Sequence, residues 1–150
     1  MRPQRYLVPA ILGTALLAAA GIGVHQASAH HAFAAEFDGN LPVMLRGKVT
    51  KIEWINPHAW IHLAAVQPNG STTPWMVEGG TPNTLLRQGI NRNTLKIGTE
   101  IVVRGFQSKD KLCNPTCRAN GRDLTFADGR KLFMGSSGTG APKDGSEPNS

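Results

Sequence analysis

The sequence lacks the patterns that indicate most enzymes and nucleic-acid-binding proteins. It has no Gly-rich phosphate-binding loop, no Ser-His-Asp spacing and no run of five or more basic residues. Its carboxylates Glu53, Glu78, Asp123 and Asp128 form no recognisable acid–base pair. Catalysis therefore has the least support, nucleic acid is not an expected partner, and we expect a non-catalytic binding module.

Beyond its first section, the chain also lacks a hydrophobic run long enough to span a bilayer. The first section has the pattern of a secretory signal peptide, with Arg2 and Arg5, an apolar run over residues 6–24 and a small-residue cleavage site at 27–29. The alternative is an uncleaved membrane anchor, because the run is long for a signal peptide, although its Ala and Gly content makes it only weakly apolar. We therefore expect residues 1–29 to be removed, leaving a periplasmic or secreted protein with no stable membrane span.

The mature chain is expected to form one small domain. We predict an N-terminal arm over residues 30–41, a domain over 42–135 and a disordered tail over 136–150, which is rich in Gly, Ser and Pro. Loss of Arg2 and Arg5 would reduce the formal net charge of +6 by two. A mild basic excess of this kind is ordinary for an exported, solvated surface.

The apolar pattern predicts a mainly β domain. A short helix over 84–88, with Thr81 as its N-cap and with Leu85 and Leu86 facing the sheet, is predicted between the third and fourth strands. Five or six strands with a helix in this position form a small OB-like barrel, and a small β-sandwich is the alternative. The strands are predicted from alternating and β-branched runs over residues 42–55, 58–67, 73–78, 100–107, 118–126 and 131–134.

Residues 54–63 are predicted to form a corner between the first two strands. Within the first strand the apolar residues change faces between Val49 and Ile52, which indicates a bulge near residues 50–51. Pro57 has no amide donor, so the hydrogen-bond ladder should break there.

Cleavage after residue 29 would make His30 the first residue of the mature protein. Its free α-amine and its Nδ1 can chelate one metal ion together, and a further imidazole from His31 or His58 would complete a nitrogen-rich site of the kind that copper(II) prefers. These ligands deprotonate near neutral pH. The alternative is that cleavage simply leaves His30 and His31 on a flexible arm.

His58 and His62 lie on the same face of the predicted second strand, four residues apart. At roughly 3.3 Å per residue their Cα atoms would be about 13 Å apart, too far for both imidazoles to share one ion on a regular strand. At most one of them should therefore join His30, and His58 at the corner is better placed. His62 is more simply explained as a surface or half-buried histidine beside Trp60.

The chain has two cysteines, Cys113 and Cys117. In an exported protein this pair predicts a disulfide, which would close a small loop in the longest connection. The alternative is a soft-metal or redox pair, although the spacing differs from the C-x-x-C of thioredoxin-like sites.

Three tryptophans, Trp54, Trp60 and Trp75, fall within the first three predicted strands. Trp60, His62 and Trp75 are candidates for a face that binds a peptide, a sugar or another polymer by stacking, because OB-folds use their second and third strands in this way. The alternative is that at least two of the tryptophans fill the core of a small barrel.

Four stretches carry a further signal, namely His30-His31-Ala32-Phe33-Ala34, Glu53-Trp54-Ile55-Asn56-Pro57-His58, Trp75 with Glu78-Gly79-Gly80-Thr81-Pro82-Asn83, and Asp128-Gly129-Arg130-Lys131-Leu132-Phe133. Together they resemble an uncharacterised bacterial family of small exported proteins, domain of unknown function 6152. The resemblance implies that His30, His31 and His58 belong to family motifs, and it implies no established activity. The chain is also similar to the wider group of periplasmic OB-fold proteins, which are usually described as ligand-binding modules.

We therefore predict an exported, non-catalytic OB-like barrel that binds a small molecule or a metal ion. In the most specific form of this prediction, His30 holds copper(II) together with His31 or His58, and no other cofactor is indicated. The alternative function is a peptide- or polymer-binding module that uses Trp60 and its neighbours on the second and third strands.

Overall fold

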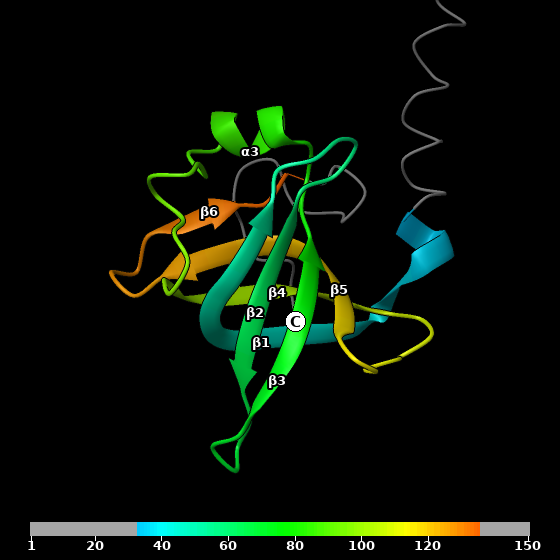
Figure 1. The fold of residues 1–150 in the computed structure, drawn as a ribbon. Coiled ribbons are helices and arrows are strands. Elements are labelled where there is room, and N and C mark those ends of the chain that lie inside the picture. The colour runs from blue at the N-terminus through cyan, green and yellow to red at the C-terminus, as the bar shows by residue number, and fades with distance from the viewer. Residues whose placement is uncertain (1–32, 136–150) are drawn as a thin grey trace, which may run out of the picture.

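The computed structural model describes residues 33–135, which form one curved sheet with a short helix at one end (Figure 1). Within these residues, no helix has the length and apolar character needed to cross a membrane. The elements are β1 (Phe37–Glu53), β2 (Trp60–Val66), β3 (Thr72–Glu78), α3 (Pro82–Arg87), β4 (Glu100–Ser108), β5 (Cys117–Phe126) and β6 (Lys131–Phe133).

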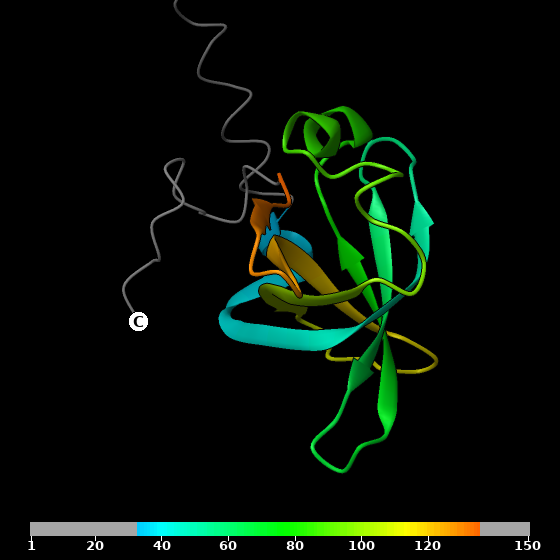
Figure 2. The same ribbon diagram turned by 90° about the vertical axis from the view of Figure 1, so that its left-hand side faces the viewer.

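The sheet closes on itself into a barrel-like ring. Its strand order is β3-β2-β1-β4-β5-β6, and β3 also pairs with β5. All neighbours are antiparallel except β3 and β5, which run parallel. Five strands thus form the ring and β6 extends β5, which confirms a mainly β, OB-like arrangement in place of two packed sheets. Figures 1 and 2 show α3 over one end of the ring and the β2–β3 hairpin projecting from the other.

β1 is the longest strand, and it contributes to two parts of the ring. Residues 42–48 pair with β4, residues 47–53 pair with β2, and the register with β2 shifts between Val49 and Lys51. The predicted bulge is therefore confirmed at its predicted position. A bend of this kind lets one strand hydrogen-bond to two neighbours that diverge around a small barrel.

The strand begins earlier than the sequence pattern predicted, because the chain before it docks on the barrel. Phe37 is 2% exposed, and its ring centroid lies 5.9 Å from that of Phe33. Phe33 in turn meets Phe106 of β4 edge to face, with centroids 5.8 Å apart. Residues 37–41, assigned to an arm by the sequence pattern, are thus already strand, and the predicted start at Pro42 is wrong.

Alternate side chains of the strands point into the ring and form the core, as the pattern predicted. Leu85 of α3 closes one end and is fully buried, whereas Leu86 is 52% exposed, so the prediction that both face the sheet is wrong. Adjacent helical residues point about 100° apart, so a helix this short directs only one of them inward. Thr81 caps the helix as predicted, since its side chain accepts a hydrogen bond from the Thr84 amide.

The connection between β4 and β5 carries the predicted disulfide between Cys113 and Cys117. Cys117 is buried and is the first residue of β5, where it lies opposite Trp75 of β3. The disulfide therefore fixes the loop at the point where the parallel pairing begins.

Close approach of β1 and β2 requires a residue without a side chain at Gly47. A Cβ at this position would lie less than 3.0 Å from the backbone of Ala64 and Ala65. Gly39, in the same strand, has open space where its Cβ would be.

We expect Gly47→Ala to lower the free energy of unfolding by about 3 kcal/mol or more, because backbone atoms of β2 would have to move. Gly39→Ala is the matched control and should leave stability unchanged or slightly raised, since alanine reduces the freedom of the unfolded chain. Urea denaturation of both variants measures the difference. Equal destabilisation by the two substitutions would contradict the close packing of β1 on β2.

Candidate ligand site on the outer face of β2, β3 and β5

Three neighbouring strands place polar residues side by side on the outside of the ring. Trp60 of β2 lies opposite Glu78 of β3, and Glu78 lies opposite Asn120 of β5. The next residues in register, Ile61, Val77 and Ala119, are fully buried in the core. Because side chains alternate between faces, Trp60, Glu78 and Asn120 share the outer face.

The corner between β1 and β2 places His58 against this row. The corner contains a cis peptide bond between Asn56 and Pro57. The Ala59 amide donates to Gly80 O at 3.0 Å, and the Gly79 amide donates to Ala59 O at 2.8 Å, so the backbone beside His58 is tied to the end of β3. His58 Nδ1 consequently contacts Glu78 Oε1.

Burial raises the pKa of the Glu78 carboxyl above its ordinary value of 4.5. The charges of His58 and Arg118 act in the opposite direction, and the nearby charge of Glu36 raises the pKa further. Loss of hydration disfavours the ionised carboxylate, and in this site that effect outweighs the attraction of its cationic neighbours.

The chain before β1 is attached to the same outer face. The Arg118 guanidinium of β5 donates to Glu36 Oε2 at 2.8 Å and lies 5.9 Å from the centre of the Trp60 ring. Lys109 Nζ also donates to Ala34 O. The first described residues therefore lie beside β5, the strand that carries Asn120.

This geometry suits His58 to bind a ligand through its outer nitrogen. Nδ1 is engaged by Glu78, and within residues 33–135 Nε2 has no hydrogen-bond partner. With its proton on Nδ1, the ring is held in one orientation and presents the Nε2 lone pair outward, which is the arrangement of most metal-binding histidines with a carboxylate behind them. The side chain is 44% exposed, so a ligand can reach it.

The structure brings no second predicted metal ligand to His58 within residues 33–135. His30 and His31 lie outside the described residues. Over residues 33–135, no group of three or more His, Cys, Asp or Glu side chains is placed to hold a metal ion. His62 has a separate environment, with Glu53 Oε1 3.4 Å from its Nε2. Metal binding by His30, His31 and His58 therefore stays a prediction.

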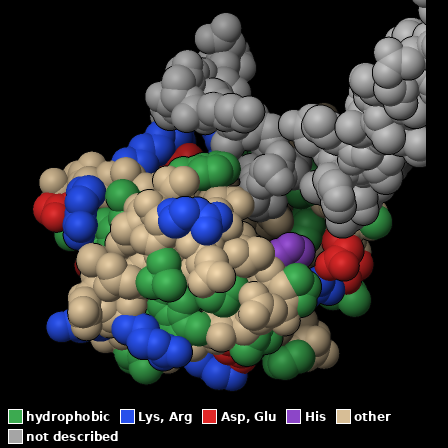
Figure 3. Space-filling model, turned by 90° about the horizontal axis from the view of Figure 1, so that it is seen from above, with side chains coloured by type: hydrophobic (Ala, Val, Ile, Leu, Met, Phe, Trp, Pro, Cys, Tyr) green, Lys and Arg blue, Asp and Glu red, His purple; other side chains and the backbone are tan. Residues whose placement is uncertain are grey.

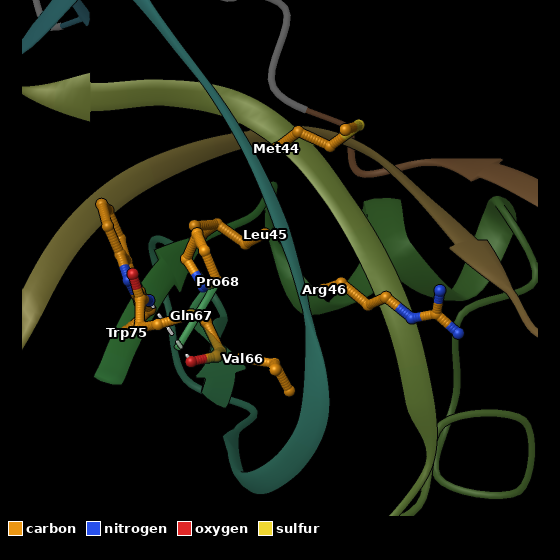
Figure 4. Close-up of a pocket in the computed structure, with 8 residues that line it drawn as sticks. Met44, Leu45, Arg46, Val66, Gln67, Pro68 and Trp75 are labelled. Carbon is orange, nitrogen blue, oxygen red and sulfur yellow. Dashed lines mark hydrogen bonds between the residues drawn. The ribbon is translucent and has the colours of Figure 1, made fainter. Parts of the chain in front are cut away.

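The predicted aromatic face is divided between the two sides of the sheet. Trp60 and His62 are half-buried on the outer side, whereas Trp75 lies opposite Leu63, is 8% exposed and belongs to the core. Trp75 lines a groove of about 410 Å³ between β1 and the end of the β2–β3 hairpin, where it faces Leu45 and Pro68 (Figure 4). A ligand that stacks on Trp60 would not reach it.

The sequence pattern did not identify Glu78, Arg118, Glu36 or Asn120 as members of a site. Asn120 is buried, and its Oδ1 has no hydrogen-bond partner within residues 33–135. The position of Glu78 opposite Trp60 follows from the hairpin register once the Asn69-Gly70 turn is located, so the sequence contained that signal. The contacts of Arg118 and Glu36 depend on ring closure and had no local signal.

We expect Glu78→Gln to change how stability depends on pH. Because the pKa of Glu78 is higher in the folded protein than in the unfolded chain, its contribution to stability is present below about pH 4.5 and is lost as the pH rises through the raised pKa. The glutamine side chain of the variant does not ionise. The free energy of unfolding of the variant, relative to the wild type, should therefore increase as the pH rises from 4.5. Urea titrations at several pH values measure this trend.

Glu53→Gln is the matched control, and its stability relative to the wild type should change with pH in the opposite direction. The hydrogen bond from Lys51 lowers the pKa of Glu53, so its contribution is present above about pH 4.5 and is lost as the pH falls. Relative to the wild type, this variant should gain stability as the pH falls. If the relative stability of both variants changed with pH in the same direction, the environments assigned to Glu78 and Glu53 would be contradicted.

Comparison with known proteins gives a family but no activity. No curated protein matches the chain. The family model described as "Family of unknown function (DUF6152)" matches residues 17–116, which cover β1 to β4 and the whole connection to β5. The matched range includes His30, His31, His58, Trp60 and Glu78, while β5, β6 and the 128–133 motif lie beyond it. The chain therefore belongs to the DUF6152 family of unknown function.

Proposed function

We propose that this protein is an exported, non-catalytic module that binds a metal ion or a small ligand, and that copper(II) held by His30 and His58 is the most specific form of that function. One observation carries the proposal. His58, oriented by Glu78 and accessible through Nε2, lies on the same outer face to which the segment following His30 is attached. An imidazole and a terminal amine with its own imidazole would supply three nitrogen ligands, which copper(II) prefers.

The length of the chain permits the two parts of the site to meet. His30 precedes Glu36 by six residues. Residues 33–36 are helical, so at about 1.5 Å per helical residue and about 3.5 Å per extended residue this segment spans up to about 15 Å. Glu36 contacts Arg118, and both of these charges act on the Glu78 carboxyl beside His58. The proposal requires the His30 amine to reach His58 Nε2 over this span, and His31 is an alternative donor on the same segment.

Glu78 would act on the metal through His58. Its carboxylate fixes the orientation of the ring and makes Nε2 more basic, and outer partners of this kind change metal affinity by about 10- to 100-fold. Export is itself part of the proposal, because only removal of the predicted leader would expose the amine of His30.

The alternative function, binding of a peptide or another polymer by an aromatic face, has less support. Trp75 lies on the core side of the sheet, so the outer face offers Trp60 and His62, and the Arg118 guanidinium already lies over Trp60. A polymer ligand would change Trp60 fluorescence without a metal ion.

We expect a protein that begins at His30 to bind copper(II) at least about tenfold more tightly than the same protein with one extra N-terminal residue, because the extra residue removes the chelating amine. His58→Asn should lower the affinity similarly, and Glu78→Gln by about 10- to 100-fold. Isothermal titration with copper(II) at neutral pH measures all four proteins.

His62→Asn is the matched control, since His62 has its own carboxylate neighbour in Glu53. It should bind copper(II) as tightly as the wild type. Mass spectrometry of the exported protein checks the starting residue and any retained metal. Equal copper affinity with and without the extra residue would exclude the N-terminal site.

A further inference from the structure

Three arginines of the described chain lie over aromatic rings, and among these three Arg92 is the one without a carboxylate partner. Arg118 lies over Trp60 and pairs with Glu36, and Arg130 lies over Phe126 with its Nε 3.8 Å from Asp128. Arg92 lies 5.6 Å from the centre of the Trp54 ring, and within residues 33–135 it has no carboxylate partner. Its guanidinium therefore retains a full set of N–H donors for an anion from outside.

Arg92 borders an apolar groove of about 290 Å³. The connection between α3 and β4 is fixed along β1, because the Gly98 amide donates to Val49 O at 2.7 Å and the Val49 amide donates to Thr99 O at 2.9 Å. The groove remains between the two segments. It is lined by Ile52, Trp54, Arg92, Leu95, Lys96 and Ile97.

The stretch of chain that supplies Arg92, Leu95, Lys96 and Ile97 to this groove carries only positive charge. Between Glu78 and Glu100 the sequence contains no Asp or Glu, but it contains Arg87, Arg92 and Lys96. On the β1 side, Glu53 lies between Ile52 and Trp54 and is paired with Lys51. Glu100, at the start of β4, accepts from Arg46 at 2.8 Å. Figure 3, which views the end of the molecule where α3 lies, shows hydrophobic and basic side chains together, with acidic side chains toward the rim.

We propose that this groove binds a small organic carboxylate with an apolar body. The planar guanidinium of Arg92 is suited to a carboxylate, which it can hold with two parallel hydrogen bonds, and Lys96 supplies a second positive charge. Trp54 and Ile97 contact the apolar part of the ligand. Ile97 is 74% exposed, so a ligand in the groove would cover apolar surface that otherwise faces solvent.

The volume of the groove limits the size of the ligand. It lies at the lower end of the range for small-molecule pockets, so a short phenylalkanoate fits it better than a long acyl chain. The site is separate from the proposed copper site, and it is expected to bind in the absence of metal.

The test uses two probes with the same phenyl group and chain length, 4-phenylbutanoate, which ends in a carboxylate, and 4-phenylbutanol, which ends in a neutral hydroxyl. Each is added to the metal-free, ¹⁵N-labelled protein in a chelating buffer. The indole N–H signals of the three tryptophans are followed by NMR, with Trp54 assigned from Trp54→Phe. We expect the carboxylate to shift the Trp54 signal in a saturable manner and to leave those of Trp60 and Trp75 in place. The alcohol should bind at least about tenfold more weakly, because it lacks the charge-assisted hydrogen bonds.

Arg92→Gln removes the charge from an exposed side chain and should weaken binding of the carboxylate by roughly tenfold. Arg130→Gln, at an arginine that already has an acidic neighbour, is the matched control and should leave the dissociation constant unchanged. Equal shifts with the alcohol, an unchanged constant in Arg92→Gln, or no saturable shift of Trp54 would each overturn the proposal. The spectrum of each variant without probe, compared with that of the wild type, confirms that the variant is folded.

Discussion

The parallel pairing of β3 with β5 is the constraint on which both the core and the candidate site depend. It closes five strands into a ring, so Val77 and Ala119 face the interior with no exposed sheet edge between them. The same register brings Glu78 beside Asn120 on the outside. The disulfide between Cys113 and Cys117 stands where this pairing starts, which places a covalent constraint beside the one parallel contact of the ring.

Burial of Glu78 has a cost that the rest of the site offsets only in part. Partial removal from water raises its pKa although His58 and Arg118 lie nearby. A buried carboxyl of this kind destabilises the fold when it ionises, and a leucine or valine there would avoid the cost. Its presence beside an accessible histidine is therefore better explained by orientation of His58 than by stability. Asp123, another buried carboxylate, has a different environment, because the Arg104 guanidinium donates two hydrogen bonds to it, one to each oxygen.

Much of the fold follows from local sequence signals, and the reason is that alternation and turn chemistry act over a few residues. The bulge after Val49, the Thr81 cap and the order of strands and helix along the chain could all be predicted in this way. The start of β1 could not, because Phe37 becomes strand through contacts with Phe33 and through pairing with Ser108, far along the chain. Leu86 was misassigned because a six-residue helix is too short for periodicity to choose between two adjacent leucines.

The candidate site was only partly predictable for a related reason. His58 and Trp60 stand out as residue types in one short stretch, but their neighbours come from three other segments. Glu78 could be placed from the hairpin register, whereas Arg118 and Glu36 meet only after the ring closes and the segment before β1 docks. Trp75 was grouped with Trp60 because both are aromatic residues on neighbouring strands. Strand alternation instead places the two side chains on opposite sides of the sheet.

The division of the proposed copper site between the barrel and the leading segment has a consequence for where it can operate. The described residues supply one well-placed imidazole, and a single imidazole holds copper(II) only weakly. The remaining ligands would have to come from His30 as terminal residue, and in the proposal its amine is part of a peptide bond until the predicted leader is removed. Before processing, that nitrogen is a planar amide and a poor metal ligand at neutral pH. A protein built in this way would therefore acquire tight copper binding only after export. No further structural feature would be needed to prevent tight copper binding during synthesis.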